Sequence, residues 1–251
     1  MIKIFSNKIE LALFFCDELE KLVSQKKEIF LCLSGGNTPE IIYQTLSKDY
    51  KTKIDWNKVN LFWGDERCVP PESDESNYGM TKKYLLNFID IPSKNIHYIV
   101  GEDDPEREAV KYSEVINKNV PIKNNHPKFD LVMLGLGEDG HTASIFPDQM
   151  EVIASEKLCE VTLHPTTKQK RITLTAKIFN NAARVIFLVT GKSKATIVKK
   201  VLQEKRKIFP AEFIQSVEGE LNFFLDIDAA GHLDEKIKLR ETIFNNEIKK
   251  I

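Results

Sequence analysis

The chain has 251 residues, of which 42% are hydrophobic and 29% are charged, with 36 basic and 37 acidic side chains. This composition is typical of a soluble globular protein, and because no linker interrupts the chain we expect a single domain over residues 1–251. The formal net charge of −1 argues against bulk attraction to nucleic acid or to an anionic membrane, so an anionic ligand requires a local basic cluster.

The cysteine content indicates a reducing compartment. None of the four cysteines belongs to a CxxC pair, so neither a zinc ribbon nor a redox motif is indicated. The N-terminus lacks the charged, apolar and cleavage regions of a signal peptide, and no apolar run approaches the ~18 residues of a membrane span. We therefore expect a cytoplasmic protein that does not bind membranes.

Strand-like and helical segments alternate along the chain. Strands are expected at residues 2–5, 28–33, 59–63, 96–100, 129–134, 158–163, 171–175, 184–190 and 221–226. Helices are expected at residues 7–27, 39–46, 77–88, 105–120, 176–182, 195–203 and 210–215, with a charged helical tail at 231–251. The alternation predicts a mostly parallel, doubly wound (Rossmann-like) α/β sheet with helices on both faces, and it allows a small antiparallel addition.

Four polar or glycine-rich turns follow buried strands. They come directly after Leu33, Trp63, Leu134 and Thr190. If these strands are parallel, their turns lie at one edge of the sheet, where open α/β sheets bind ligands. The four turns are therefore expected to line one cleft.

The first turn combines two glycines with the start of a helix. It consists of Ser34, Gly35, Gly36, Asn37 and Thr38. Pro39 suits the first helical position and Thr38 suits the N-cap, so free backbone N–H groups would face a phosphate. The turn has neither the Walker nor the GxGxxG spacing, and an ordinary strand-to-helix turn is the alternative.

The second and fourth turns carry charges. Asp65, Glu66 and Arg67 follow one buried strand, and Lys192 lies just after Gly191 at a predicted helix start. If each segment is taken alone, the alternative for residues 65–67 is an exposed charged loop, and the alternative for Lys192 is an ordinary exposed lysine. Their positions at the expected cleft favour a functional reading.

The third turn contains a candidate acid–base group. His141 follows Gly135, Gly137 and Gly140, and Asp139 lies two residues before it. Glycine permits the chain to turn sharply where the strand ends. Histidine has an unperturbed pKa of ~6.5, which suits proton transfer near neutral pH.

Six sequence blocks, in order, resemble the 6-phosphogluconolactonases, which form a superfamily with the glucosamine-6-phosphate deaminases. The blocks are LSGGNTP (33–39), WGDERCVPPESDESNYGM (63–80), LGLGEDGHTASIFP (134–147), RITLT (171–175), FLVTGKSKA (187–195) and DIDAA (226–230). The run after DER and the HTASIFP ending are similar to the lactonase branch. Two departures are Asn37, where serine is frequent, and Phe223-Phe224, where a tryptophan often stands.

The resemblance implies hydrolysis of 6-phospho-D-glucono-1,5-lactone to 6-phosphogluconate, a step of the pentose phosphate pathway. We expect His141 to act as general base, oriented by Asp139, with Glu138 or Asp65 as alternatives. Arg67 is expected to face the developing oxyanion. The substrate phosphate is expected on the turn of residues 34–38, with charge supplied by Arg171 and Lys192. No metal ion or cofactor is expected, and the expected assembly is a monomer or a weak homodimer.

Two other functions remain open. A glucosamine-6-phosphate deaminase would use a carboxylate such as Asp65 to move a proton beside the carbonyl carbon. A sugar-phosphate-binding regulator would keep the phosphate site without catalysis. The presence of Asp139, His141 and Arg67 argues against a regulator, because such a protein needs no general base. A covalent mechanism through Ser34 or Ser144 is disfavoured, because neither lies in a GxSxG elbow.

Overall fold

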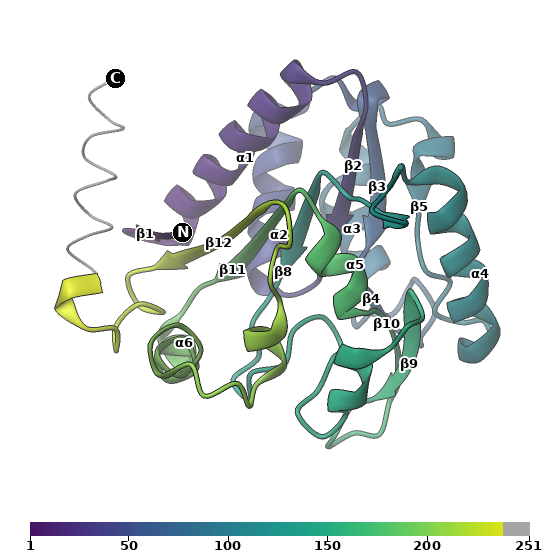
Figure 1. The fold of residues 1–251 in the computed structure, drawn as a ribbon. Helices are drawn as coiled ribbons and strands as arrows, with labels where there is room; N and C mark the ends of the chain where they lie inside the picture. The colour runs from purple at the N-terminus through teal and green to yellow at the C-terminus, as the bar shows by residue number, and fades with distance from the viewer. Residues whose placement is uncertain (238–251) are drawn as a thin grey trace.

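The computed structural model describes residues 1–237, which form a central parallel sheet of seven strands. Its strand order is β1-β12-β11-β8-β2-β3-β5, and every neighbouring pair is parallel (Figure 1). The strands are β1 (Ile2–Phe5), β2 (Ile29–Leu33), β3 (Val59–Trp63), β5 (Ile96–His97), β8 (Leu131–Leu134), β11 (Arg184–Val189) and β12 (Glu220–Asp226). The predicted doubly wound α/β class is confirmed.

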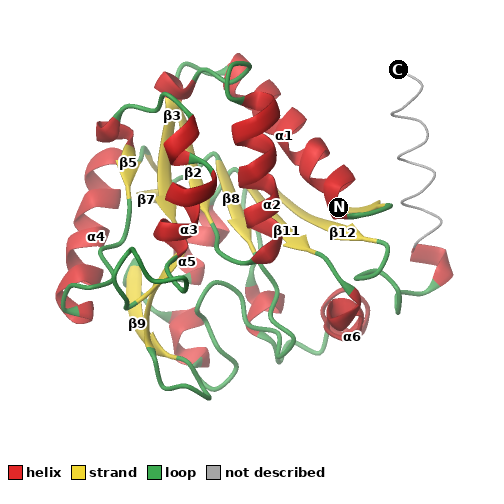
Figure 2. Ribbon diagram, turned by 180° about the vertical axis from the view of Figure 1, so that it is seen from behind, coloured by secondary structure: helices red, strands yellow, loops and turns green. Residues whose placement is uncertain are grey.

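Helices cover both faces of this sheet. They are α1 (Lys8–Gln25), α2 (Asn37–Thr45), α3 (Asn77–Tyr84), α4 (Pro105–Asn119), α5 (Ala176–Asn181) and α6 (Ala195–Lys199). Figure 2 shows α1, α2 and α3 on one face, Figure 1 shows α5 on the other, and α4 lies at the β5 edge. Short 3₁₀ turns occur at Trp56–Lys58, Leu86–Phe88, Ser93–Asn95, Met150–Ala154, Lys192–Lys194 and Pro210–Phe213, and π turns at Leu46–Tyr50 and Lys200–Glu204.

Burial on both faces explains the apolar runs of the central strands. All five residues of β2 and all five of β3 are buried, as expected for inner strands of a parallel sheet with helices on each side. Helix α1 contributes Leu11, Phe15 and Leu19, which lie on one face because they are four residues apart. The side chain of Asn7 caps this helix by accepting from the N–H groups of Ile9 and Glu10.

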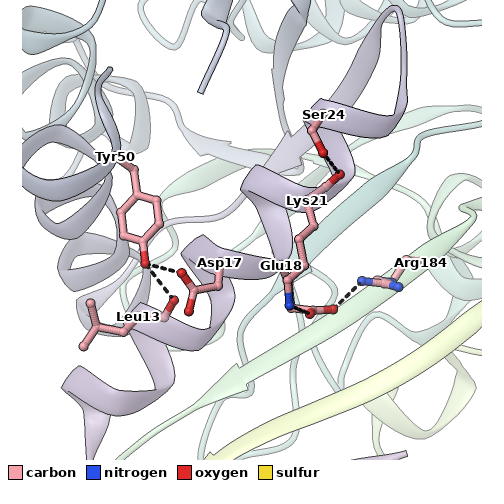
Figure 3. A network of polar contacts seen from close by, with 7 residues as sticks. All are labelled: Leu13, Asp17, Glu18, Lys21, Ser24, Tyr50 and Arg184. Atoms are coloured by element: carbon pink, nitrogen blue, oxygen red, sulfur yellow. Dashed lines mark hydrogen bonds and ion pairs between the residues drawn. The ribbon is translucent and has the colours of Figure 1, made fainter. Parts of the chain in front are cut away.

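Polar contacts hold α1 at both of its flanks (Figure 3). The Tyr50 hydroxyl donates to the Asp17 carboxylate at 2.5 Å, which joins α1 to the chain that follows α2. On the other side, Arg184 at the start of β11 pairs with Glu18 at 3.2 Å. The Arg184–Glu18 pair lies at the amino end of β11, away from the edge where the four turns meet.

A second, antiparallel sheet lies beyond the carboxyl ends of the main strands (Figure 1). It consists of β4 (Asp65–Arg67), β10 (Lys170–Leu174) and β9 (Cys159–Leu163) in the order β4-β10-β9. The small antiparallel addition is thus present, and the Asp65–Arg67 segment, predicted as a turn, is one of its strands. A further hairpin, β6 (Ile122–Lys123) with β7 (His126–Pro127), lies in the chain between α4 and β8.

Two predicted helices differ from the structure, one in its start and one in its continuity. Helix α2 begins at Asn37, and its N-cap is Gly36 with φ +99°, so the prediction that Thr38 caps this helix is wrong. Glycine tolerates that backbone angle, which lets the helix start two residues earlier than predicted. The segment predicted as one helix at 195–203 is divided between α6 and a π turn.

The predicted helical tail at residues 231–251 is described only up to residue 237. Residues 238–251 of the predicted helical tail lie outside the described residues. Within residues 1–237, no helix combines the length and apolar character needed to cross a membrane.

Candidate active site

A cleft of about 720 Å³ lies where the sheet changes its winding direction. From β2 the strands continue through β3 and β5 on one side, whereas β8, β11 and β12 extend on the other. Loops diverge at such a switch point and leave a ligand crevice at the carboxyl ends. All four turns predicted to meet here contribute to its lining, through residues 34–38, Asp65 and Arg67, residues 135–138 with His141, and residues 190–194 except Lys192.

The first turn presents a helix N-terminus to this cleft. Gly36 caps α2 without any side-chain hydrogen bond, so the first N–H groups of the helix are not satisfied by a capping side chain. Gly35 packs so closely that a Cβ there would lie 1.8 Å from Asn77 Oδ1. Thr38 lies 2.7 Å from the Thr190 hydroxyl, which fastens the turn to the end of β11. This geometry suits a phosphate or another anion.

The turn after β11 provides the second half of that anion site. Gly191 has φ +95°, and its N–H lies 3.0 Å from both carboxylate oxygens of Asp226 at the end of β12. Lys194 lines the cleft, whereas Lys192 is exposed and does not. Residues 192–194 form a 3₁₀ turn, in which successive side chains point in different directions. The lysine that faces the cleft is therefore Lys194, two residues beyond the predicted one.

His141 is held by the carboxylate two residues before it. Its Nδ1 lies 2.6 Å from Asp139 Oδ1, and its backbone N–H donates to the same oxygen at 3.1 Å. Partial burial acts to raise the pKa of Asp139, but the hydrogen bonds and charge of His141 outweigh it and lower this pKa to about 2. Asp139, rather than Glu138 or Asp65, therefore contacts the ring, and Nε2 is the nitrogen left for a ligand.

The glycines around His141 have steric roles. A Cβ on Gly137 would lie 2.1 Å from His141 Nδ1 and 2.5 Å from Asp139 Oδ1. Gly140 has φ +86° and packs against the Phe209 ring, where a Cβ would approach to 2.4 Å. Only glycine lets the chain fold back this tightly around the Asp139–His141 pair.

The two carboxylates of β4 are both engaged. Asp65 accepts from Ser144 Oγ at 2.7 Å and from Asn77 Nδ2 at 3.3 Å, so it joins β4 to the His141 loop and to α3. The neighbouring Glu66 accepts from the backbone N–H groups of residues 67, 77 and 78 and thereby caps α3.

Two arginines stand opposite each other beside the cleft. Arg67 on β4 is paired in register with Arg171 on the antiparallel strand β10. Arg67 lines the cleft and donates through Nη1 to the Glu75 carbonyl oxygen. The Nε atoms of both arginines are buried without a hydrogen-bond partner. Burial lowers the pKa of Arg171, the charge of Arg67 lowers it further, and Asp65 raises it.

The structure thus assembles most of the predicted site and adds to it. Two basic residues absent from the prediction, Lys8 and Lys194, also line the cleft. The sequence contains both Lys192 and Lys194 in its GKSK run, but it does not indicate which of them lines the cleft. Among residues 1–237 no group of three or more His, Cys, Asp or Glu side chains has the arrangement of a metal site.

The fold and the cleft together define a doubly wound α/β protein with a ligand site at its topological switch point. A family model described as glucosamine-6-phosphate isomerases/6-phosphogluconolactonase matches residues 8–223, so the chain belongs to this family.

Individual relatives agree with this assignment. The 6-phosphogluconolactonase of Haemophilus influenzae is 40% identical over 201 residues, covering 79% of this chain and 84% of that protein. A crystal structure of the devB protein is 37% identical with a TM-score of 0.89, covering 93% of this chain and 100% of that one. The structure of 6-phosphogluconolactonase from Thermotoga maritima is 31% identical with a TM-score of 0.78, covering 90% and 98%.

Proposed function

We propose that this protein hydrolyses 6-phospho-D-glucono-1,5-lactone to 6-phospho-D-gluconate in the oxidative branch of the pentose phosphate pathway. Relatives that are 36–40% identical over about four fifths of the chain carry the name of this activity. The cleft joins an anion site to an acid–base pair, which are the two parts that a phosphorylated lactone requires.

The Asp139–His141 pair is the observation that carries the proposal. With Nδ1 bonded to Asp139, Nε2 of His141 takes a proton from a water molecule as the water oxygen adds to the lactone carbonyl carbon. The tetrahedral oxyanion then collapses, the bond from C1 to the ring oxygen breaks, and that oxygen receives the proton from the imidazolium. Asp139 stabilises the imidazolium while it exists, because its lowered pKa keeps it ionised.

Other residues of the cleft bind and polarise the substrate. The phosphate lies on the turn of residues 34–38, with charge from Lys194 in place of the predicted Lys192. Arg67 faces the oxyanion as a fixed cation whose Nε has no protein partner.

A coupled assay tests the activity. Glucose-6-phosphate dehydrogenase generates the lactone, and its disappearance is compared with the spontaneous rate. No acceleration by the protein would refute the lactonase proposal. Ammonia release from glucosamine 6-phosphate would instead indicate a deaminase, and saturable binding without turnover would indicate a regulator. The engagement of Asp65 by Ser144 and Asn77 argues against a deaminase base at that position.

A further inference from the structure

We propose that Arg67 and Arg171 form a carboxylate subsite that binds C1 of the aldonic acid product, separate from the turns that bind its phosphate. This inference rests on the proposed function, because the carboxylate exists only after the lactone has opened. It also reassigns Arg171, which the sequence placed with the phosphate.

The two arginines are close enough to share one ligand. Arg67 and Arg171 are direct cross-strand partners in an antiparallel pair, so their side chains leave the same face of the small sheet as neighbours. Two like charges opposite each other repel, and an anion between them removes this repulsion. The planar guanidinium group matches the two oxygens of a carboxylate better than other cationic side chains do.

The protein itself does not supply that anion. Asp65 is engaged by Ser144 and Asn77, and Glu66 by backbone N–H groups. The carboxylate of Glu75 accepts from Gln169 Nε2 at 2.8 Å. Within residues 1–237 neither arginine forms an ion pair, and each retains a buried Nε without an acceptor. Buried donors are normally satisfied, so a missing acceptor points to a ligand.

The surroundings place this pair at the reactive end of the cleft. Arg67 lines the same cleft as His141, and Arg171 is the cross-strand partner of Arg67. Arg171 does not line the part of the cleft formed by the glycine turns.

The chemistry of the product fits the pair. Hydrolysis converts a neutral ester carbonyl into a carboxylate at the carbon beside His141. The arginines would meet the negative charge first on the tetrahedral oxyanion and then on the product. The subsite should therefore bind the open-chain acid and should not recognise an alcohol at C1.

Calorimetric titration with two phosphorylated ligands tests this assignment. The probes are 6-phosphogluconate and glucitol 6-phosphate, which have the same carbon chain but carry a carboxylate or an alcohol at C1. For Arg171→Met we expect affinity for 6-phosphogluconate to fall about tenfold to hundredfold, while affinity for glucitol 6-phosphate stays within about twofold of wild type. Lys170→Met is the matched control, because Lys170 is the exposed neighbour on β10 and pairs with Glu106.

The other outcomes also decide the question. If Arg171→Met loses affinity equally for both ligands, Arg171 binds the phosphate and the proposal is wrong. If its affinity for both ligands is unchanged, the proposal of a carboxylate subsite is also wrong. If Arg171→Met does not fold, Arg171→Lys keeps the charge but lacks the planar fork, and the same selective loss is expected. If the wild-type protein binds 6-phosphogluconate selectively but does not hydrolyse the lactone, the carboxylate subsite stands and the lactonase proposal fails.

Discussion

His141 Nδ1 lies 2.6 Å from Asp139 Oδ1, and the backbone N–H of His141 bonds the same oxygen. One carboxylate thus fixes both the ring and the main chain of the proposed base. The ring orientation is set locally, within three consecutive residues, while the cleft that it faces is built from strands far apart in the sequence.

Replacement of His141 by alanine should remove the base and leave the binding turns in place. We expect kcat for lactone hydrolysis to fall by about 10²–10⁴-fold, the usual contribution of a positioned acid–base group. The affinity for 6-phosphogluconate should change little, because the phosphate turns are untouched. The coupled assay and calorimetry measure both, and near-normal turnover would rule out His141 as the base.

Asp139→Asn should affect both stability and turnover. The folded-state pKa of Asp139, about 2, lies below its ordinary value of 3.8, so its ionised form stabilises the fold. This stabilisation is present above pH ~4 and is lost as the pH falls towards 2. Urea unfolding should therefore show a stability difference between wild type and Asp139→Asn that shrinks with acidification. A difference that does not depend on pH would contradict this account. At neutral pH we expect kcat to fall by roughly 10²-fold or more, because asparagine cannot stabilise the imidazolium.

Lys194 and Lys192 offer a matched pair in one turn. Lys194→Met should raise KM for the lactone and weaken phosphate binding by roughly tenfold or more, because a charge-assisted contact is lost. Lys192→Met should leave both within about twofold, since this side chain points into solvent. Steady-state kinetics of the two variants measure this difference. A larger effect of Lys192→Met than of Lys194→Met would show that Lys192, the lysine favoured by the sequence, binds the phosphate.

Gly137 and Gly135 offer a second matched pair. An alanine Cβ at position 137 would lie 2.1 Å from His141 Nδ1, so the Asp139–His141 pair must shift. A displacement of about 1 Å is expected to lower kcat by up to ~10²-fold. Gly135→Ala meets no protein atom within 4 Å, so it should leave the Asp139–His141 pair in place and lower kcat much less than Gly137→Ala, with its methyl group in the open cleft. Equal activity of the two variants would show that the loop can adapt to a side chain.

The bond from Ser144 to Asp65 should matter for stability. Ser144→Ala leaves the buried Asp65 carboxylate with one donor fewer, at a cost of about 1–3 kcal/mol in the free energy of unfolding. Ser24→Ala is the control, because Ser24 makes only a local, exposed hydrogen bond to Lys21 O on α1. Chemical denaturation of both variants measures the difference, and equal values would mean that Asp65 finds another partner.

Much of the architecture was predictable because its signals are local. Each central strand is a short apolar run, and each ends in glycine or charged residues, so the strands and their carboxyl-end turns could be read in order. The main error occurred where backbone geometry replaced a propensity: Gly36, with φ +99°, caps α2 in place of Thr38. The structure also adds Lys194, which lines the cleft at the turn where the sequence favoured Lys192.

By itself, the sequence determined the alternation of strands and helices and the turn that carries both Asp139 and His141. These features depend on residues that are neighbours in the chain. Only the tertiary structure decided that residues 65–67 form a strand, that Arg67 stands opposite Arg171, and that Asp65 bonds Ser144. Those contacts join segments 79 or more residues apart, and their geometry follows from how the small sheet packs beyond the main one rather than from any local pattern.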